Sequence, residues 1–215
     1  MRALAWTVAV VFLSSHVVLG QPVALGVKAG FWPTDDVSGS LHPESKRYIV
    51  GPALEVRLPL RFSFEFDALY RRLGFTGYIN SIGFYGTQRE RDNSWEFPMI
   101  AKYHLPAPLL HPFVGVGYAP HTVHGTDTIS GCTLQGLGPY VCGSNGNKLN
   151  TTYSLTHGLV VSGGVDLGSR HVRVAPEFRY VHWIMPFLNQ YGGVGSFRYV
   201  SAQNELFVLV GVSWR

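Results

Sequence analysis

Three histidines and an aspartate in the second half of the chain are residue types that bind zinc. His121 and His124 form an H-x-x-H pair, and Asp127 and His157 would be the further ligands. Zinc needs at least three such ligands converging on one point. Residues three apart on an extended chain face opposite sides. We therefore expect solvated histidines at a rim rather than a metal site.

The same region holds side chains of the types used by hydrolases. A lipid hydrolase or protease needs a nucleophile, a base and an orienting acid that meet. His157 with Ser154 or Ser162 is the nearest set, but alternation points Ser162 inward and His157 outward. No G-x-S-x-G motif accompanies them. The sequence therefore predicts a protein that is not an enzyme, with no catalytic, cofactor-binding or metal-binding residues.

Cys132 and Cys142 are the only cysteines, and both fall in the longest predicted loop. In an exported protein two cysteines this close are expected to form a disulfide, and two free thiols are the alternative. The loop is rich in glycine, with Gly131, Gly136, Gly138, Gly143 and Gly146. A bridge would restrain it by about 3 kcal/mol in the chain-entropy description.

All of these residues must be positioned by strands, because apolar and polar residues alternate along the chain. Phe62, Phe64 and Phe66 share one face, and Ser63, Glu65 and Asp67 share the other. Similar segments begin near Val23, Tyr48, Phe62, Trp95, Phe113, Leu159, Val172 and Leu206. Pro98 and Pro176 predict bulges or bends, since proline removes a ladder donor.

The connections between these eight segments alternate in length. Short links lie near Pro59, between Leu105 and Pro112, and at Gly168 to His171, and long links cover about 33–47, 73–93, 120–156 and 184–203. Each strand with its connection has about 24 residues, too many for a 16-strand porin. The pattern predicts an all-β, eight-stranded antiparallel up-and-down transmembrane β-barrel, with short periplasmic turns and long extracellular loops.

Charge is nearly balanced on the polar face of these strands. The residues are Lys28, Glu55, Arg57, Glu65, Asp67, Arg71, Glu96, Lys102, Asp166, Arg173, Glu177, Arg179 and Glu205. A confined interior requires such balance, because an unpaired buried charge costs several kcal/mol. The thirteen residues therefore predict an interior charge network that plugs the barrel, with a narrow pore as the alternative.

Aromatic residues gather near the strand ends. Phe31, Tyr48, Tyr70, Trp95 and Tyr180 lie toward the loops, and Tyr103, Phe113 and Trp214 lie toward the turns. Membrane barrels carry such girdles at both water–lipid boundaries. A soluble core also uses aromatic residues, so a secreted lipocalin-like ligand-binding barrel stays open.

The first 20 residues have the pattern of a secretory signal peptide. Arg2 precedes the apolar run 3–13, and Gly20 offers a small residue for cleavage. Residues 21–215 then form one barrel domain, and no apolar run there approaches the ~20 residues of a spanning helix. We predict export to the cell outer membrane.

Two segments resemble those of a known family. Trp95-Glu96-Phe97-Pro98 with Lys102-Tyr103, and Pro176-Glu177-Phe178-Arg179-Tyr180 with Trp183, resemble segments of bacterial outer-membrane β-barrel proteins of the OmpA-type transmembrane domain. The resemblance implies a small barrel without a common enzyme activity.

These features together predict a non-enzymatic membrane scaffold whose loops make surface contacts or mediate adhesion. The 17 basic residues against 13 acidic ones are scattered, so no nucleic acid partner is expected. Expected partners are outer-membrane lipids and lipopolysaccharide, the barrel-assembly machinery during biogenesis, and an unknown surface partner at loop 120–156. The chain is expected to be a monomer without cofactors. A lipid-modifying outer-membrane enzyme remains the catalytic alternative.

Overall fold

The computed structural model describes residues 23–38, 42–107, 110–136, 138–143, 147–152, 155–168, 171–186, 189–191 and 198–214. The predicted signal peptide, residues 1–20, lies outside these described residues. Within the described ranges, no helix has the length and apolar character needed to cross a membrane.

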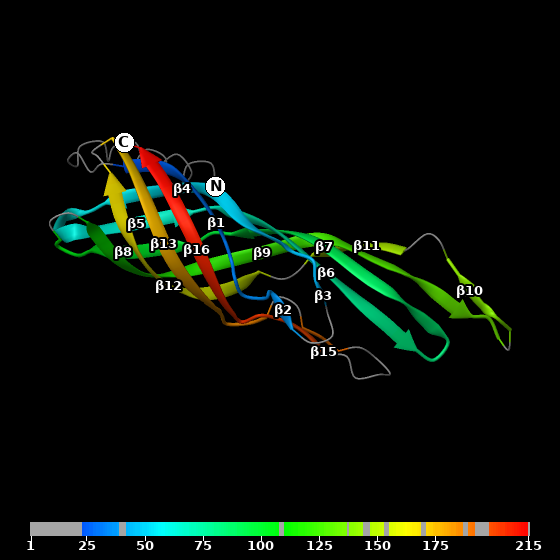
Figure 1. Ribbon diagram of the computed structural model, residues 1–215. Helices are drawn as coiled ribbons and strands as arrows, with labels where there is room; N and C mark the ends of the chain where they lie inside the picture. The colour runs from blue at the N-terminus through cyan, green and yellow to red at the C-terminus, as the bar shows by residue number, and fades with distance from the viewer. Residues whose placement is uncertain are drawn as a thin grey trace, which may run out of the picture.

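Eight antiparallel strands close into a barrel, as predicted (Figure 1). Each strand pairs with the next, and closure follows because β16 pairs back with β1. Leu25 lies opposite Trp214, so the first and last strands meet at one end. The strands are β1 (Val23–Phe31), β4 (Lys46–Arg57), β5 (Phe62–Asp67) continued by β6 (Leu69–Ser81), β7 (Phe84–Glu96) continued by β8 (Met99–His104), β9 (His111–Leu134), β12 (Thr156–Gly168), β13 (Val172–Trp183) and β16 (Asn204–Trp214).

Three of these strands run far beyond the barrel, on the side away from Leu25 and Trp214 (Figure 1). Their extensions pair with the short strands β3 (His42–Pro43), β10 (Tyr140–Cys142) and β11 (Asn147–Thr152). We call this the projecting sheet; it comprises residues 73–92, 123–134, 140–142 and 147–152 with β3. The prediction of loops at 73–93 and 120–156 was therefore wrong for most of both ranges. Near the barrel, residues such as Leu73, Phe75 and Val123 are still buried on one face. Farther out most residues on both faces are at least partly exposed, which weakens the alternation that reveals a strand.

A second, smaller sheet joins two other connections. β2 (Val37–Ser38) pairs with β15 (Arg198–Ser201), which pairs with β14 (Asn189–Tyr191). The amide N–H of Ala202 also donates to the carbonyl oxygen of Asp36 at 2.9 Å. We call these three strands the cap. They lie in the connections that follow β1 and precede β16. The cap ties the predicted links 33–47 and 184–203 to one another.

The alternation seen in the sequence separates the two faces of the barrel. Phe62, Phe64 and Phe66 are 44 to 46% exposed on the outside, whereas Ser63, Glu65 and Asp67 are buried inside. The outer face also carries exposed aromatic residues near both strand ends: Phe31, Tyr48, Trp95, Tyr180, Phe62 and Trp214.

Phe113 does not belong to that outer set, so its predicted place in the girdle was wrong. Its side chain is only 2% exposed and lies inside the barrel. The Nζ of Lys102 lies 4.2 Å from the centre of its ring, a cation–π contact. Phe113 has the same parity as Gly115 and Gly117, which face inward, so a strict count along the strand would have placed it correctly.

Large apolar side chains fill much of the inner face, which the sequence analysis described only as charged. They form one buried cluster: Trp32, Ile49, Leu69, Leu73, Ile100, Ala119, Val123, Val160, Val181, Trp183, Phe207 and Leu209. Two of its rings, Trp32 and Phe207, lie against the buried guanidinium of Arg71. Apolar and charged side chains therefore fill the interior together, and such side chains pack without leaving room for water.

The two strand prolines behave differently. Pro98 lies in the break between β7 and β8, where its carbonyl oxygen accepts the amide N–H of Asp67 at 3.0 Å. Pro176 stays within β13 and pairs in register with Val210 of β16. On the β12 side the pairing of β13 skips Pro176, as expected for a residue without an N–H group. Both prolines of the predicted bulges or bends therefore interrupt the pairing locally, and the register of the neighbouring strands does not shift at either one.

Candidate functional site

Six predicted interior residues meet near the middle of the barrel, and we call them the central ionic group. The Nζ of Lys28 lies 2.7 Å from Oε2 of Glu177, and it also pairs with Glu65 and Asp67. The Nζ of Lys102 lies 2.6 Å from Oε2 of Glu65. Arg179 completes the group, with its Nη2 2.7 Å from Asp67 and 2.8 Å from Glu177. Three cations thus face three carboxylates, so the group is neutral overall.

Arg71, Glu96 and Glu205 form a second cluster, the upper ionic group. The Nε of Arg71 lies 2.9 Å from Glu96, and its Nη1 lies 2.9 Å from Glu205. The indole N–H of Trp183 donates to the other oxygen of Glu205 at 2.8 Å. The guanidinium of Arg71 also lies 5.2 Å from the centre of the Trp32 ring. All three ionic side chains are buried.

The remaining four predicted charges lie at the barrel end where β1 begins and β16 ends, and we call them the mouth ionic group. Arg57 lies 2.7 Å from Asp166 and 3.2 Å from Glu55. Arg173 lies 3.9 Å from Asp166. His104, which the sequence analysis did not select, lies between Glu55 and Asp166 at 3.4 and 3.5 Å. The structure therefore places each of the thirteen residues in an ion pair, in three groups along the barrel axis.

The residues considered for zinc do not come together. His121 is buried inside the barrel, where its ring nitrogens contact Ser94 at 2.6 Å and Thr156 at 3.1 Å. The expectation of a solvated rim was therefore wrong for His121. His157 stacks on Tyr118 at the outer face, and Asp127 accepts a hydrogen bond from Gln88 at 2.7 Å. Among the described residues, no three potential ligands gather around one point.

The residues considered for hydrolysis are also separated. Ser162 is buried on the inner face, whereas His157 lies on the outer face with Tyr118. Ser154 lies outside the described residues. Among the described residues, the buried hydroxyl of Ser162 has no hydrogen-bond partner, so no base contacts it there.

The predicted disulfide between Cys132 and Cys142 is present and joins β9 to β10. It lies far out on the projecting sheet, beside the exposed aromatic rings of Tyr85 and Tyr140, whose centres are 5.1 Å apart. Ile82, in the turn between β6 and β7, is 94% exposed. The outer part of the sheet therefore presents apolar side chains on a covalently closed frame.

Exposed cations lie on the outer face of the sheet, just beyond the aromatic residues Tyr70 and Trp95. We call Lys46, Arg72, Arg89 and Arg91 the outer basic belt; they line a hollow of about 360 Å³ together with Glu44. Glu44 accepts from Arg89 at 2.6 Å and from Thr76 at 2.7 Å, and these hydrogen bonds lower the pKa of its carboxyl. One carboxylate against four cations leaves the hollow positively charged.

Comparison with known proteins identifies the fold. No protein-family model matches the sequence, and no curated protein matches it significantly. Among solved structures, Neisserial surface protein A (NspA) matches 91% of this chain and 99% of its own, with 12% identity and a TM-score of 0.53. The N-terminal barrel domain of Pseudomonas aeruginosa OprF (11% identity, 91% and 98% covered, TM-score 0.39) and Ail of Yersinia pestis (8% identity, 89% and 99% covered, TM-score 0.38) also match. The chain thus shares the fold of the small eight-stranded outer-membrane barrels.

Proposed function

We propose that this protein is a non-enzymatic outer-membrane β-barrel that displays the projecting sheet for contact or adhesion at the cell surface. One observation carries the proposal: β6, β7 and β9 continue without interruption from the barrel into a sheet closed by Cys132 and Cys142. A rigid frame presenting exposed side chains is the usual arrangement for recognition.

The outer face supports a membrane location. From Phe62 to Tyr70 the outward residues of β5 and β6 cover about 26 Å of strand, at ~3.3 Å per residue. Strands tilted by about 35–45° turn this length into an apolar band about 20 Å tall, which approaches the ~25 Å expected of an outer-membrane barrel. The predicted signal peptide, residues 1–20, would direct export.

The interior supports a closed barrel rather than a pore. Internal ion pairs hold the three ionic groups together, and the apolar cluster packs its Trp32 and Phe207 rings against Arg71 of the upper ionic group. Eight strands leave room for side chains alone. We expect no stable ion conductance from the purified protein in planar lipid bilayers, and regular unitary currents would favour the narrow pore instead.

The outer basic belt supports a contact with lipopolysaccharide. Arg72 is two residues beyond Tyr70, and Arg91 is opposite Gly74 in the next row. These cations would stand where phosphates lie above the apolar band, and arginine suits phosphate recognition. Replacing Arg72 and Arg91 with Gln should lower the lipopolysaccharide that copurifies several-fold. The control Arg47→Gln should not, because Arg47 already pairs with Asp35 at 2.5 Å.

Surface display can be tested with two epitope insertions. Ile82 and Leu60 are 94% and 83% exposed in turns at opposite ends of the molecule. On intact cells an antibody should detect the epitope at Ile82, and the epitope at Leu60 should need permeabilised cells. Recovery of the protein in the soluble fraction, with both epitopes accessible there, would support the secreted ligand-binding barrel instead.

A lipid-modifying enzyme makes a different prediction. Expression of such an enzyme would change the masses of outer-membrane lipids, whereas a scaffold would leave them unchanged. Cell fractionation, with heated and unheated samples compared by gel mobility, would also establish whether the folded monomeric barrel resides in the outer membrane. Barrels of this kind are inserted by the barrel-assembly machinery, whose depletion should reduce the folded form.

A further inference from the structure

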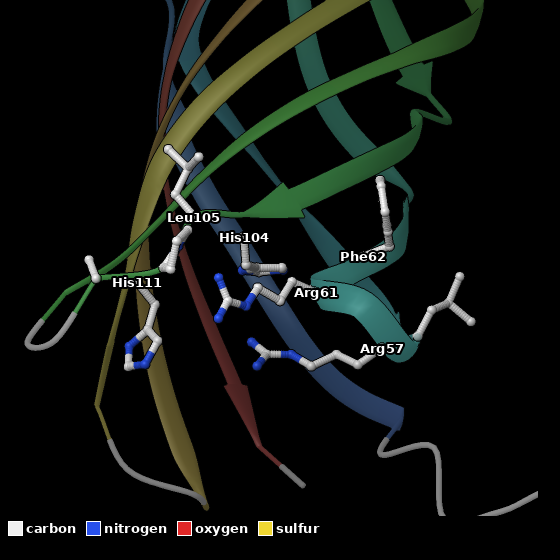
Figure 2. A pocket seen from close by; sticks show the side chains of 9 residues that line it. Arg57, Arg61, Phe62, His104, Leu105 and His111 are labelled. Atoms are coloured by element: carbon white, nitrogen blue, oxygen red, sulfur yellow. The ribbon is translucent and has the colours of Figure 1, made fainter.

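The barrel end where β1 begins and β16 ends holds a pocket between two neighbouring turns. The turn η2 (Pro59–Arg61) joins β4 to β5, and the segment after His104 leaves β8, which pairs with β5. The space between them has a volume of about 620 Å³, within the range of small-molecule sites. Figure 2 shows side chains from both turns around it: Arg57, Arg61, Phe62, His104, Leu105 and His111.

The basic residues in this pocket differ in what they already bind. Arg57 is held by Asp166 and Glu55 in the mouth ionic group. Arg61 and His111, by contrast, have no ion-pair or hydrogen-bond partner among the described residues. Figure 2 shows the nitrogens of Arg57 and Arg61 pointing into the same space. The pocket therefore offers an uncompensated guanidinium to an anion.

The backbone at Arg61 is unusual for its residue type. Leu60 and Arg61 have φ values of 63° and 68°, in the left-handed region that glycine occupies freely and other residues rarely adopt. Leu60 directs its side chain to solvent, being 83% exposed, and does not line the pocket. A strained conformation that aims an unpaired arginine into a cavity is a reason to look for a ligand there.

The walls of the pocket limit what that ligand can be. Leu58, Phe62, Leu105 and Pro106 supply apolar surface beside the cations. Deeper in the barrel, a cavity next to Lys28 and Glu65 has a volume of about 30 Å³, which is room for a water molecule. A ligand would thus stop at the mouth, with its charge on Arg61 and its apolar part against the turn residues.

We propose that this pocket binds a small amphipathic anion, a phosphate or carboxylate attached to an apolar body. Arg61 would donate to the anion, and Phe62 and Leu105 would cover the apolar part. The ligand could be a soluble compound or the headgroup region of an anionic lipid beside the outward ring of Phe62. Both sources share this chemistry. In the orientation given under the proposed function the pocket faces the periplasm, but binding itself does not depend on that orientation.

Titration of the folded protein in phosphatidylcholine nanodiscs with phenyl phosphate tests the proposal. We expect saturable shifts of the NMR amide signals of Arg61, Phe62 and Leu105, and at least tenfold weaker binding of inorganic phosphate or benzyl alcohol. Adding phosphatidylglycerol to the nanodisc distinguishes the two sources. If the pocket binds a lipid, phosphatidylglycerol should shift the same amide signals and weaken the binding of phenyl phosphate. If the pocket binds a soluble compound, phosphatidylglycerol should change neither the signals nor the affinity for phenyl phosphate. Absence of saturable shifts with both phenyl phosphate and phosphatidylglycerol would overturn the proposal.

Two glycine substitutions in the same turn provide the decisive comparison. Arg61→Gly removes the cation while relieving the backbone, so the barrel should fold and binding should weaken at least tenfold. Leu60→Gly relieves the adjacent residue and keeps the cation, so binding should stay within twofold of the original. Arg61→Lys should be intermediate. Equal affinity for Arg61→Gly and Leu60→Gly, with both folded by heated and unheated gel mobility, would show that Arg61 does not hold the ligand.

Discussion

Arg71 and Glu205 are 134 residues apart in the sequence, yet their Nη1 and Oε1 atoms lie 2.9 Å apart inside the barrel. Arg71 lies on β6 just before the projecting sheet begins, and Glu205 lies on β16 just after the cap. The indole N–H of Trp183, on β13, donates to the same carboxylate. This ion pair therefore joins β6 to β16 across the interior, and Trp183 adds β13 to the same contact.

Removing the cation from this pair should destabilise the barrel strongly. Arg71→Met leaves Glu96 and Glu205 buried without compensation, and the expected loss is about 3–5 kcal/mol of unfolding free energy. Urea unfolding in detergent micelles, followed by tryptophan fluorescence, measures it. The neighbouring Arg72→Met, on the exposed outer basic belt, should change stability by no more than ~0.5 kcal/mol. Similar losses for both variants would contradict the role assigned to the upper ionic group.

A charged residue on the outward face of β5 should destabilise the barrel in the membrane. Phe64 is 46% exposed on the apolar band, and Phe64→Arg should cost about 2–4 kcal/mol near the membrane midplane. Phe64→Leu is the control and should be tolerated. Ser63→Arg should act by a different route, because Ser63 is 1% exposed and contacts His104 at 2.9 Å. Refolding into lipid vesicles separates the two: only Phe64→Arg should become less harmful in a thinner bilayer.

Opening the disulfide should loosen the projecting sheet and leave the barrel intact. The double variant Cys132→Ser, Cys142→Ser removes a restraint of about 3 kcal/mol on the hairpin. Limited proteolysis should then cut residues 133–143 several-fold faster, while the heat-dependent gel shift of the barrel stays the same. Loss of that gel shift would mean that the bridge is needed for barrel folding itself.

Asp36 should make the cap sensitive to pH. Burial raises the pKa of its carboxyl above the ordinary value, so the folded protein holds this proton at a pH where the unfolded chain has lost it. Its stabilising contribution is therefore present at low pH and is lost as pH rises through the raised pKa. The stability of Asp36→Asn relative to the original protein should therefore increase as pH rises above ~3.9, the ordinary aspartate pKa.

The neighbouring residue supplies the control for that experiment. Asp35 is exposed and pairs with Arg47, so Asp35→Asn should show no such gain across the same range. Urea unfolding at a series of pH values gives the comparison. A flat difference between Asp36→Asn and the original protein would contradict the assignment.

The barrel could be predicted because its residues obey one rule throughout. Phe62 to Asp67 alternate between lipid and interior, and a charge such as Glu65 can be buried only where partners exist. Periodicity therefore located the strands and the thirteen interior charges together. Periodicity could not predict which cation pairs with which carboxylate. Lys28, for example, contacts Glu177, 149 residues away, only because the barrel closes.

Other features gave no signal of that kind. In the outer part of the projecting sheet most residues on both faces are at least partly exposed, so Thr126 and Ile129 do not sort by polarity. The left-handed backbone at Leu60 and Arg61 could not be predicted, because neither residue is a glycine or asparagine, the types that usually mark this conformation. The burial of His121 was not predicted because histidine is common at exposed rims. Only its position on the same face as Ala119 and Val123, which are both buried, would have placed it inside the barrel.

The unbroken course of β9 has a mechanical consequence. Its hydrogen bonds to β7 run from Glu96 opposite His121 out to Phe84 opposite Thr133, with no hinge loop between membrane and tip. A force applied to the tip acts along the strands. The hydrogen bonds between β7 and β9 are therefore loaded in shear, so that many of them resist together instead of breaking one after another. A cell held through this sheet would have a stiff tether whose resistance comes from backbone geometry rather than from the chemistry of its tip.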